Sequence, residues 1–424
     1  MDASVPIRYP GAMNVEFLGG AGEIGRSAIL IDGTLLLDFG TTTDTPPRYP
    51  LKTPDPGAVV VSHGHLDHAG AVPALLSGDN RPDIHWTPPT AELTRILARD
   101  TLKLQANSPS LPFHEQELKR LGEVSQLQGY GEPFEAAGYE ITLFDAGHIP
   151  GSAHVLVDDG DTRLLYTGDF NTEDQRLVAG TTARPEADAV IVECTYADTE
   201  RKPRAYLEAT FAESVRTTLW EGGTVVAPAF AIGRTQEVMC ICADQNLDVY
   251  VDGMGTRITG MFRRFPEFLR DPEELRRAKS NARFVDGRDG QRKRIAEQGT
   301  IIITTSGMLS GGPAMTYVPA IRTHPVNKIT LTGYQVEGTP GRELLDTGRA
   351  EIDGRVMPIS AQVESYDFSA HADRQGLLAF LDEYRGAEVL VNHGDNCATF
   401  AEQLREDGFE ASAPELGETV QVGE

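Results

Sequence analysis

Short runs of apolar and β-branched residues recur along the first half of the chain, separated by glycine, proline and polar residues. Runs of this length between turn residues are typical of β-strands joined by tight connections. They predict strands at residues 14–18, 27–31, 34–39, 58–62, 139–145, 154–158, 163–167 and 189–193. Apolar positions at helical spacing predict helices at residues 69–76, 91–104 and 115–121. We therefore expect mixed α/β structure in this half.

From about residue 203 to about residue 349 the pattern changes to apolar strands that alternate with amphipathic helices. The predicted strands cover residues 224–227, 248–251, 301–305 and 328–332. Such alternation favours a parallel sheet flanked by helices, and therefore a separate α/β domain. After about residue 351 the pattern predicts a further strand at 388–391 and a helix at 399–405.

The composition narrows the class of protein. A chain of 424 residues is long enough for two or three domains. No apolar run approaches the length of a membrane span, and the start Met1-Asp2-Ala3-Ser4 lacks a basic and apolar signal region. These features predict a soluble, cytoplasmic protein with no membrane association. The four cysteines show no CxxC spacing, which predicts reduced thiols rather than a zinc knuckle or a disulfide framework.

The net charge of −25 argues against a nucleic-acid partner unless cations are locally concentrated. Only seven of the 38 basic residues are lysine, and this acidic, lysine-poor balance resembles that of proteins from salt-accumulating, halophilic cytoplasms. In molar salt the Debye length falls to about 3 Å, so the overall charge would hardly repel RNA. The stretch from residue 257 to residue 294 contains twelve basic and six acidic residues. This stretch is either an RNA-facing surface or a set of solvated mixed-charge helices.

The strongest chemical signal is the segment Val59-Val60-Val61-Ser62-His63-Gly64-His65-Leu66-Asp67-His68, in which an apolar strand runs into four ligand-type side chains. Imidazole and carboxylate groups suit Zn²⁺, with Mn²⁺ or Fe²⁺ as alternatives. The alternating histidines place both rings on one side of an extended backbone, and the last two groups point toward a second ion. The alternative is a solvated polar loop. Packing in such a loop would not explain why four ligand-type side chains occur together.

A two-ion site needs further ligands, typically a histidine from elsewhere and a carboxylate shared by both metals. His148, Asp169 and His393 each follow a predicted apolar strand. Taken singly, such residues are more often turn or cap residues, and only their joint occurrence indicates a site. The GxGxxG pattern at residues 20–25 precedes another strand rather than a helix, which excludes a dinucleotide fingerprint and favours a hairpin.

Ordered motifs along the whole chain resemble a known family. HxHxDH at 63–68, GHIPGSAH at 147–154, TGDF at 167–170 and LDFG at 37–40 resemble the metallo-β-lactamase superfamily. Motifs A, B and C of its β-CASP nucleases are similar to residues 192–198, 368–373 and 391–395, with Asp395 in place of the usual glutamate. The segments 228–237, 305–309 and 333–342 are also family-like. The chain most resembles archaeal homologues of the cleavage and polyadenylation specificity factor nuclease without KH domains.

The resemblance implies a fold and a set of ligands. It implies an αββα sandwich built from residues 1–195 and 352–424, interrupted by an α/β β-CASP domain at 196–351. By this resemblance His63, His65 and His148 hold one zinc. Asp67, His68 and His393 hold the other, and Asp169 bridges the two. Asp38 would orient the site from behind the ligands.

The same resemblance implies a zinc-dependent ribonuclease that hydrolyses RNA through a water activated by two metals, in mRNA 3′-end processing or decay. Attack would be endonucleolytic, 5′-to-3′ exonucleolytic or both. Glu193 and Asp67 would be catalytic, and His371 would protonate the leaving oxygen or stabilise the phosphorane. His393 in motif C is the residue that RNA-cleaving members carry.

Four further residues are candidates for substrate binding. Ser369 with the backbone of Ala370 and Ala372 would bind a flanking phosphate, and Arg234 would contact phosphate or pair with a neighbouring acid. The implied partners are RNA, a second copy in a homodimer, and the transcription or RNA-decay machinery. The alternatives are a noncatalytic RNA-processing scaffold, or a DNA-directed or small-molecule hydrolase of the same fold.

Overall fold

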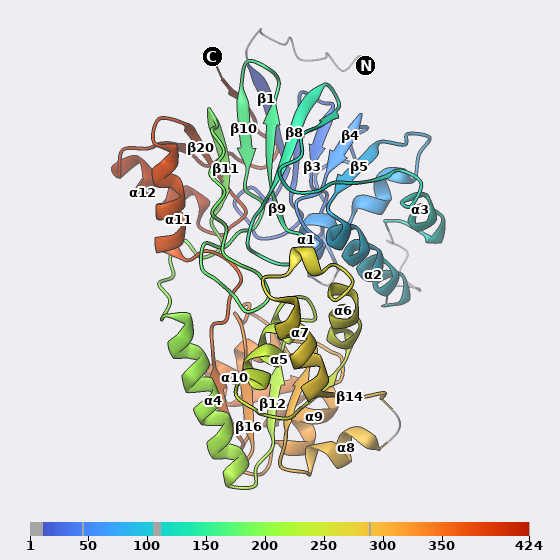
Figure 1. Cartoon of the computed structure of the whole chain (residues 1–424), viewed down its shortest axis with the longest axis vertical. Helices are drawn as coiled ribbons and strands as arrows, with labels where there is room; N and C mark the ends of the chain where they lie inside the picture. Colours follow the sequence, from blue (N-terminus) through green and yellow to red (C-terminus); the bar gives the residue numbers. More distant parts are fainter. Residues whose placement is uncertain (1–11, 45, 105–111, 288–289, 424) are drawn as a thin grey trace. The chain divides into compact units, whose positions relative to one another are not determined.

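The computed structural model describes residues 12–44, 46–104, 112–287 and 290–423, which form two compact units (Figure 1). Unit 1 comprises Met1–Asp174, Gly180–Glu200 and His371–Glu424. Unit 2 comprises Gln175–Ala179 and Arg201–Ala370. Unit 2 therefore extends past residue 351, where the insertion was predicted to end. The extension follows from β19 (Gln362–Ser365), which pairs in parallel with β16 (Lys328–Leu331) of unit 2.

Unit 1 contains two seven-stranded sheets. The first has the order β22-β1-β2-β3-β4-β5-β6, with bounds Thr419–Val422, Met13–Gly19, Ala28–Ile31, Leu35–Leu37, Ala58–Val60, Asp83–Trp86 and Ser125–Leu127. The second has the order β21-β20-β11-β10-β9-β8-β7, with bounds Glu410–Ser412, Glu388–Asn392, Ala189–Glu193, Arg163–Tyr166, Ala153–Asp158, Tyr139–Asp145 and Phe134–Ala136. Each sheet joins strands from both ends of the chain.

Alternating side chains explain how the two sheets form layers. In β4, Ala58 and Val60 face the core between the sheets, whereas Val59 faces the helices on the outer side. In β11, Ile191 faces the core between the sheets and Val192 faces outward. Both faces of each sheet are thus covered, as the predicted αββα sandwich requires. The fold-class prediction is confirmed.

Helices cover the outer face of each sheet (Figure 1). Those on the first sheet are α1 (Leu66–Ala69), the 3₁₀ helix η1 (Val72–Leu76), α2 (Pro88–Leu104) and α3 (Glu115–Arg120). Those on the second sheet are α11 (Arg374–Leu381), η3 (Asp382–Tyr384) and α12 (Cys397–Glu406). The single helix predicted at 69–76 is wrong: α1 begins earlier and ends at Ala69, and a 3₁₀ turn follows. Pro73 lacks the N–H group that would continue an α-helix.

The C-terminal part of the chain completes unit 1. Strand β20 pairs in parallel with β11, so that Asn392 lies opposite Glu193. Strand β22 pairs in antiparallel fashion with β1. As a result, the loop after β20 lies beside the loop after β11, although the two are about half the chain apart in sequence.

Unit 2 is built on a six-stranded sheet whose neighbouring strands are all parallel. Its order is β14-β13-β15-β12-β16-β19, and the strands not yet given are β14 (Ala282–Phe284), β13 (Val249–Asp252), β15 (Ile301–Thr304) and β12 (Val225–Pro228). A separate hairpin joins β17 (Arg349–Ile352) and β18 (Arg355–Pro358). The helices are α4 (Arg204–Trp220), α5 (Arg234–Asp244), α6 (Met254–Phe262), η2 (Pro266–Phe268), α7 (Pro272–Asn281), α8 (Gln291–Ala296), α9 (Ala314–Ile321) and α10 (Pro340–Thr347). Among the described residues, no helix is long and apolar enough to cross a membrane.

His154 of β9 is a buried histidine of the unit 1 core. Its ring packs against Phe170 and Phe380, and its Nδ1 lies 2.8 Å from the carbonyl oxygen of Thr167. Burial lowers the pKa of His154 to about 4, although the hydrogen bond to Thr167 opposes the shift. The unfolded chain takes up this proton near pH 6.5, so the folded state loses stability as the pH falls from about 6.5 to about 4.

We expect this loss to be about 3 kcal/mol across that window. In the variant His154→Phe, the ring remains but the titration is absent. Urea unfolding at about pH 7 and about pH 4.5 should show a smaller fall in the unfolding free energy for His154→Phe than for the wild type. Equal falls in both proteins would show that His154 is not held neutral.

Candidate metal centre

The seven predicted ligands all lie in unit 1, at or just after the carboxyl ends of strands. His63 and His65 follow β4, and Asp67 and His68 lie in α1 directly behind them. The others follow β8, β10 and β20, and are His148, Asp169 and His393. Gly64 lets the loop pack closely, because a β-carbon there would overlap the side chain of Leu93.

Three imidazoles converge on one oxygen of Asp169. The Oδ2 atom lies 3.5 Å from His63 Nε2 and 3.8 Å from His148 Nε2. His65 Nδ1 lies 3.1 Å from each of the same two nitrogens. One ligand atom from each of the four residues therefore lies within 4.8 Å of all the others.

The other oxygen of Asp169 faces a second group. The Oδ1 atom lies 3.2 Å from His68 Nε2 and 3.6 Å from His393 Nε2. His393 Nε2 also lies 3.8 Å from Asp67 Oδ2. The four ligand atoms of this group again lie within 4.8 Å of one another. Asp169 thus belongs to both groups and offers a different oxygen to each.

The donors fit a pair of divalent metal ions. Three buried or half-buried ring nitrogens point at one another in the first group, and His393 Nε2 in the second is buried without a hydrogen-bond partner. Buried polar atoms without partners are costly, and a cation would satisfy them. Each group offers four nitrogen and oxygen donors, the coordination number that zinc prefers.

Hydrogen bonds also fix the ligand rings on the side away from Asp169. Asp38 Oδ2 lies 2.7 Å from His68 Nδ1, which directs Nε2 of that ring toward Asp169. Asp38 is fully buried and accepts hydrogen bonds from the backbone and hydroxyl of Ser62 and from the hydroxyl of Tyr166. Outer carboxylates of this kind fix the tautomer of metal-ligating histidines. Asp38 therefore lies against the Nδ1 side of the His68 ring, and its role in orienting a metal ligand stays a prediction.

Electrostatics favour the metal-binding forms of His63, His65 and Asp169, but they favour the protonated ring of His68. Burial lowers the pKa of His63 well below its usual range and also lowers that of His65, which keeps both rings neutral. For His68, burial acts in the same direction, but Asp169 and Asp38 outweigh it and raise the pKa. Burial raises the pKa of Asp169, but the surrounding histidines outweigh it and hold the pKa well below the usual range, so its carboxylate stays ionised. Neutral imidazoles and an ionised carboxylate are the forms that bind metal.

Ser27, Ser62 and Tyr166 support the ligands but were missed by the sequence analysis. Ser62 immediately precedes His63, and its hydroxyl lies 3.1 Å from His63 Nδ1. Its position in the motif could have identified it. Ser27 immediately precedes β2 and Tyr166 is the last residue of β10, and nothing in their local sequence indicates a role.

Ser27 Oγ lies 2.8 Å from His393 Nδ1, and both groups are buried. This contact leaves Nε2 of His393 facing Asp67 and Asp169. We expect Ser27→Ala to weaken metal binding in the second group by about 10-fold, because outer partners typically contribute 10- to 100-fold. Chelator competition followed by metal analysis would measure the effect, and Ser27→Thr should restore binding. Unchanged metal affinity in Ser27→Ala would exclude a positioning role.

Glu193 and His371 form a third cluster beside Asp169. His371 Nδ1 lies 3.0 Å from Glu193 Oε1. Glu193 is the last residue of β11 and also accepts hydrogen bonds from the backbone N–H groups of Phe170 and Thr195. His371 has 18% of its side chain exposed, against 1% for Glu193. The carboxylate is thus fixed, and the imidazole lies toward solvent.

The predicted phosphate-binding turn is partly wrong. The backbone N–H of Ala372 donates to the carbonyl of Phe170, so it is committed within the fold. The N–H of Ser369 donates to the carboxylate of Asp367, a group that would repel phosphate. Ser369 and Ala370 belong to unit 2, as does Arg234, which is buried at the start of α5. The roles of the Ser369 hydroxyl and of Arg234 stay predictions.

In the basic stretch 257–294, several arginines already have acidic partners. Arg292 forms an ion pair with Asp252, Arg276 with Glu273, and Arg277 with Asp271. These pairs favour the interpretation of mixed-charge helices for much of the stretch. Residues 288 and 289 lie outside the described part of the chain.

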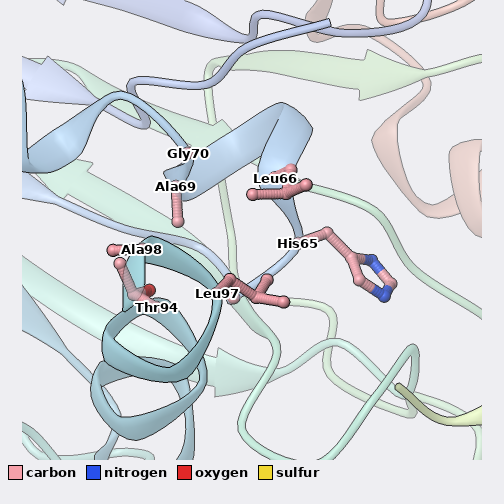
Figure 2. Close-up of a pocket in the computed structure, with 8 residues that line it drawn as sticks. His65, Leu66, Ala69, Gly70, Thr94, Leu97 and Ala98 are labelled. Carbon is pink, nitrogen blue, oxygen red and sulfur yellow. The ribbon is translucent and has the colours of Figure 1, made fainter. Parts of the chain in front are cut away.

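Figure 2 shows a small pocket on the reverse side of the metal loop. Leu66 and Ala69 of α1 lie opposite Leu97 and Ala98 of α2, and the His65 ring points away from them (Figure 2). This apolar packing anchors α1, and with it the turn that carries the ligands.

Comparison with family models places three known domains along the chain. Residues 21–185 match the metallo-β-lactamase superfamily, residues 235–344 the Beta-Casp domain, and residues 356–414 the Zn-dependent metallo-hydrolase RNA specificity domain. The first match covers all the predicted ligands except His393, which lies in the third. The domain order agrees with the resemblance read from the motifs.

Archaeal relatives are similar over nearly the whole chain. RNase aCSPSF2 of Saccharolobus solfataricus is 34% identical, covering 96% of this chain and 85% of its own. Probable RNase MJ4 of Methanocaldococcus jannaschii is 31% identical, covering 97% and 100%. Transcription termination factor FttA of Pyrococcus abyssi is 31% identical, covering 96% and 70%.

A crystal structure of an Enterococcus faecalis protein of unknown function shares the fold, with a TM-score of 0.62 at 13% identity, covering 97% of this chain and 100% of that one. At this identity the likeness concerns the fold alone. The archaeal relatives and the three domain matches establish more. The chain belongs to the β-CASP nucleases of the metallo-β-lactamase superfamily, a family of metal-dependent hydrolases.

Proposed function

We propose that the protein is a ribonuclease that uses two zinc ions to hydrolyse RNA phosphodiester bonds. One observation carries this proposal: the two oxygens of Asp169 face two separate groups of ligand atoms. A carboxylate placed in this way is suited to bridging two metals. Manganese is the alternative metal, because the ligands are nitrogen and oxygen donors without thiolate.

The proposed chemistry divides between the metals and the protein. When bound, a pair of divalent cations supplies an activated water and neutralises charge on the phosphate. The protein holds the ligand atoms in place before the substrate arrives. Asp38 and Ser62 fix the rings of His68 and His63 from behind, which lowers the cost of assembling the site.

His371 is proposed as the general acid for the departing oxygen. Its Nδ1 is engaged with Glu193, so Nε2 is the nitrogen that would present a proton. The buried carboxylate of Glu193 stabilises the imidazolium form and orients the ring. Partial exposure of His371 lets the substrate reach it. Alternatively, the positive charge of the His371 imidazolium would stabilise the phosphorane.

The proposal that RNA is the substrate rests on two observations. Relatives similar over nearly the full chain are named RNases, and His393 occupies the motif C position that the RNA-cleaving members of the family fill with histidine. The relative named as a transcription termination factor supports a link to the transcription machinery. A homodimer is part of this proposal and would be tested by light scattering.

End-labelled RNA with a 5′-monophosphate or a 5′-triphosphate tests the function directly. Wild-type protein loaded with zinc should cleave it, and the ladders from each labelled end would separate internal from terminal attack. Single-stranded DNA of the same sequence is the matched control and should be cleaved far more slowly.

The rival functions give different results in the same assay. A noncatalytic scaffold would bind RNA without cleaving it and would retain no zinc by metal analysis. A small-molecule hydrolase would leave RNA intact and consume a β-lactam or thioester substrate. Either result would overturn the proposal.

A further inference from the structure

Two cysteines that are distant in sequence meet next to the catalytic loops. Cys194 Sγ lies 3.3 Å from Cys397 Sγ, although 203 positions separate the residues. Cys194 follows Glu193 at the end of β11, and Cys397 is the first residue of α12, after the loop that carries His393. Both belong to unit 1, and both are buried.

The sulfur pair is joined to the His393 loop by direct contacts. The backbone N–H of Cys194 donates to the carbonyl of His393 at 3.1 Å. The Cys397 thiol lies 3.0 Å from the carbonyl of Gly394, to which it donates. A β-carbon at Gly394 would overlap the Cys194 sulfur, so the loop is shaped around the pair. A change in the distance between the two sulfurs would therefore shift the backbone at His393 and Glu193.

The other two cysteines provide a contrast. Cys240 and Cys242 are buried two positions apart in α5 of unit 2. Residues at this spacing point to different sides of a helix. They cannot form a disulfide bond unless the helix unfolds. Only the pair in unit 1 combines close sulfurs with a long intervening chain among the described cysteines.

We propose that Cys194 and Cys397 are an oxidation site at which a hydroperoxide forms a disulfide that slows the enzyme. The peroxide oxidises one thiol to a sulfenic acid and is reduced to water. The second sulfur then displaces the hydroxyl group, which leaves as a second water after taking the remaining thiol proton. Two S–H bonds break and one S–S bond forms, so two thiols and one hydrogen peroxide give one disulfide and two waters.

The geometry requires a small but consequential movement. A disulfide brings the sulfurs to about 2 Å, so the pair must close by about 1 Å. It also removes the thiol hydrogen that Cys397 donates to Gly394. Closure pulls the end of β11 toward the loop after β20, which displaces His393 relative to Asp67. Asp395 and Asn396 are exposed beside Cys397, and opening of this short turn would admit the oxidant.

Hydrogen peroxide treatment of the zinc-loaded full chain tests the proposal. Peptide mass mapping without reductant should identify a Cys194–Cys397 cross-link that lacks two hydrogen atoms, and dithiothreitol should reverse it. The oxidised protein should cleave RNA at least about 5-fold more slowly, a fall that one displaced contact of roughly 1 kcal/mol produces. Cys397→Ser should prevent both effects, and Cys194→Ser provides a second variant if the first fails to fold.

The double variant Cys240→Ser/Cys242→Ser is the matched control and should behave like the wild type. Absence of the cross-link under peroxide that oxidises the partly exposed methionines Met308 and Met357 would overturn the proposal. A cross-link with an unchanged cleavage rate would also overturn it. The rate measurement rests on the proposed ribonuclease function, whereas the mass map does not. Untreated protein that cleaves no RNA would therefore count against the function, and the map would still decide the cross-link.

Discussion

Replacing Asp169 by asparagine should remove metal from both groups at once. Each oxygen of the carboxylate faces a different set of ligands, and the negative charge offsets the buried histidines around it. Asparagine keeps the shape but loses the charge and one oxygen ligand. We expect zinc content to fall from two ions per chain to fewer than one, and RNA cleavage to fall by well over about 100-fold, the upper range for the loss of an outer partner.

Metal analysis after gel filtration, together with a cleavage assay, would measure both effects. Asp161→Asn is a matched control, because Asp161 is an exposed aspartate of unit 1. It should retain both metals and full activity. If Asp169→Asn retained two zinc ions, the carboxylate could not be the shared ligand.

His371→Ala should abolish most of the cleavage without loss of metal. The imidazole lies at the edge of the site and pairs with Glu193, but it belongs to neither group of proposed ligands. General acids typically contribute 10²–10⁴-fold, so we expect a fall of about this size. An activated leaving group with a low pKa should recover part of the rate, because it departs without a proton.

Glu193→Gln should lower the rate in the same direction, because the amide cannot stabilise the imidazolium. His324→Ala is the control, since His324 is an exposed histidine of unit 2. Loss of zinc in His371→Ala would assign this residue to metal binding instead. A normal rate on an ordinary RNA substrate would exclude proton transfer from His371.

The sequence predicts the proposed metal ligands because they lie at or near the ends of apolar strands and have side chains of the kind that bind metals. His63, Asp169 and His393 carry this signal in their immediate surroundings. The His/Asp cluster that could bind metal was therefore indicated before the strands were placed in sheets. Pairing of β20 with β11 then brings the distant His393 to the other ligands.

The contacts behind the ligands could not be predicted in the same way. Ser27 and Tyr166 meet His393 and Asp38 only because four strands converge, and neither has a distinctive local sequence. The contact between Cys194 and Cys397 depends on the same convergence.

The errors in the sequence analysis concern local geometry. The proline at position 73 divides the predicted helix, and the N–H group of Ala372 proves to be engaged by Phe170. A sequence pattern identifies the residue types that a phosphate-binding turn needs. It does not show which N–H groups the fold has already used. The extent of unit 2 was missed because β19 is short and three of its four residues are polar.

Anomalous X-ray diffraction at the zinc edge, from crystals of the zinc-loaded protein, tests the two-metal site most directly. We expect two peaks, one bounded by His63, His65 and His148 and the other by Asp67, His68 and His393, with Asp169 between them. A single peak, or a second peak that His393 does not reach, would contradict the proposed site.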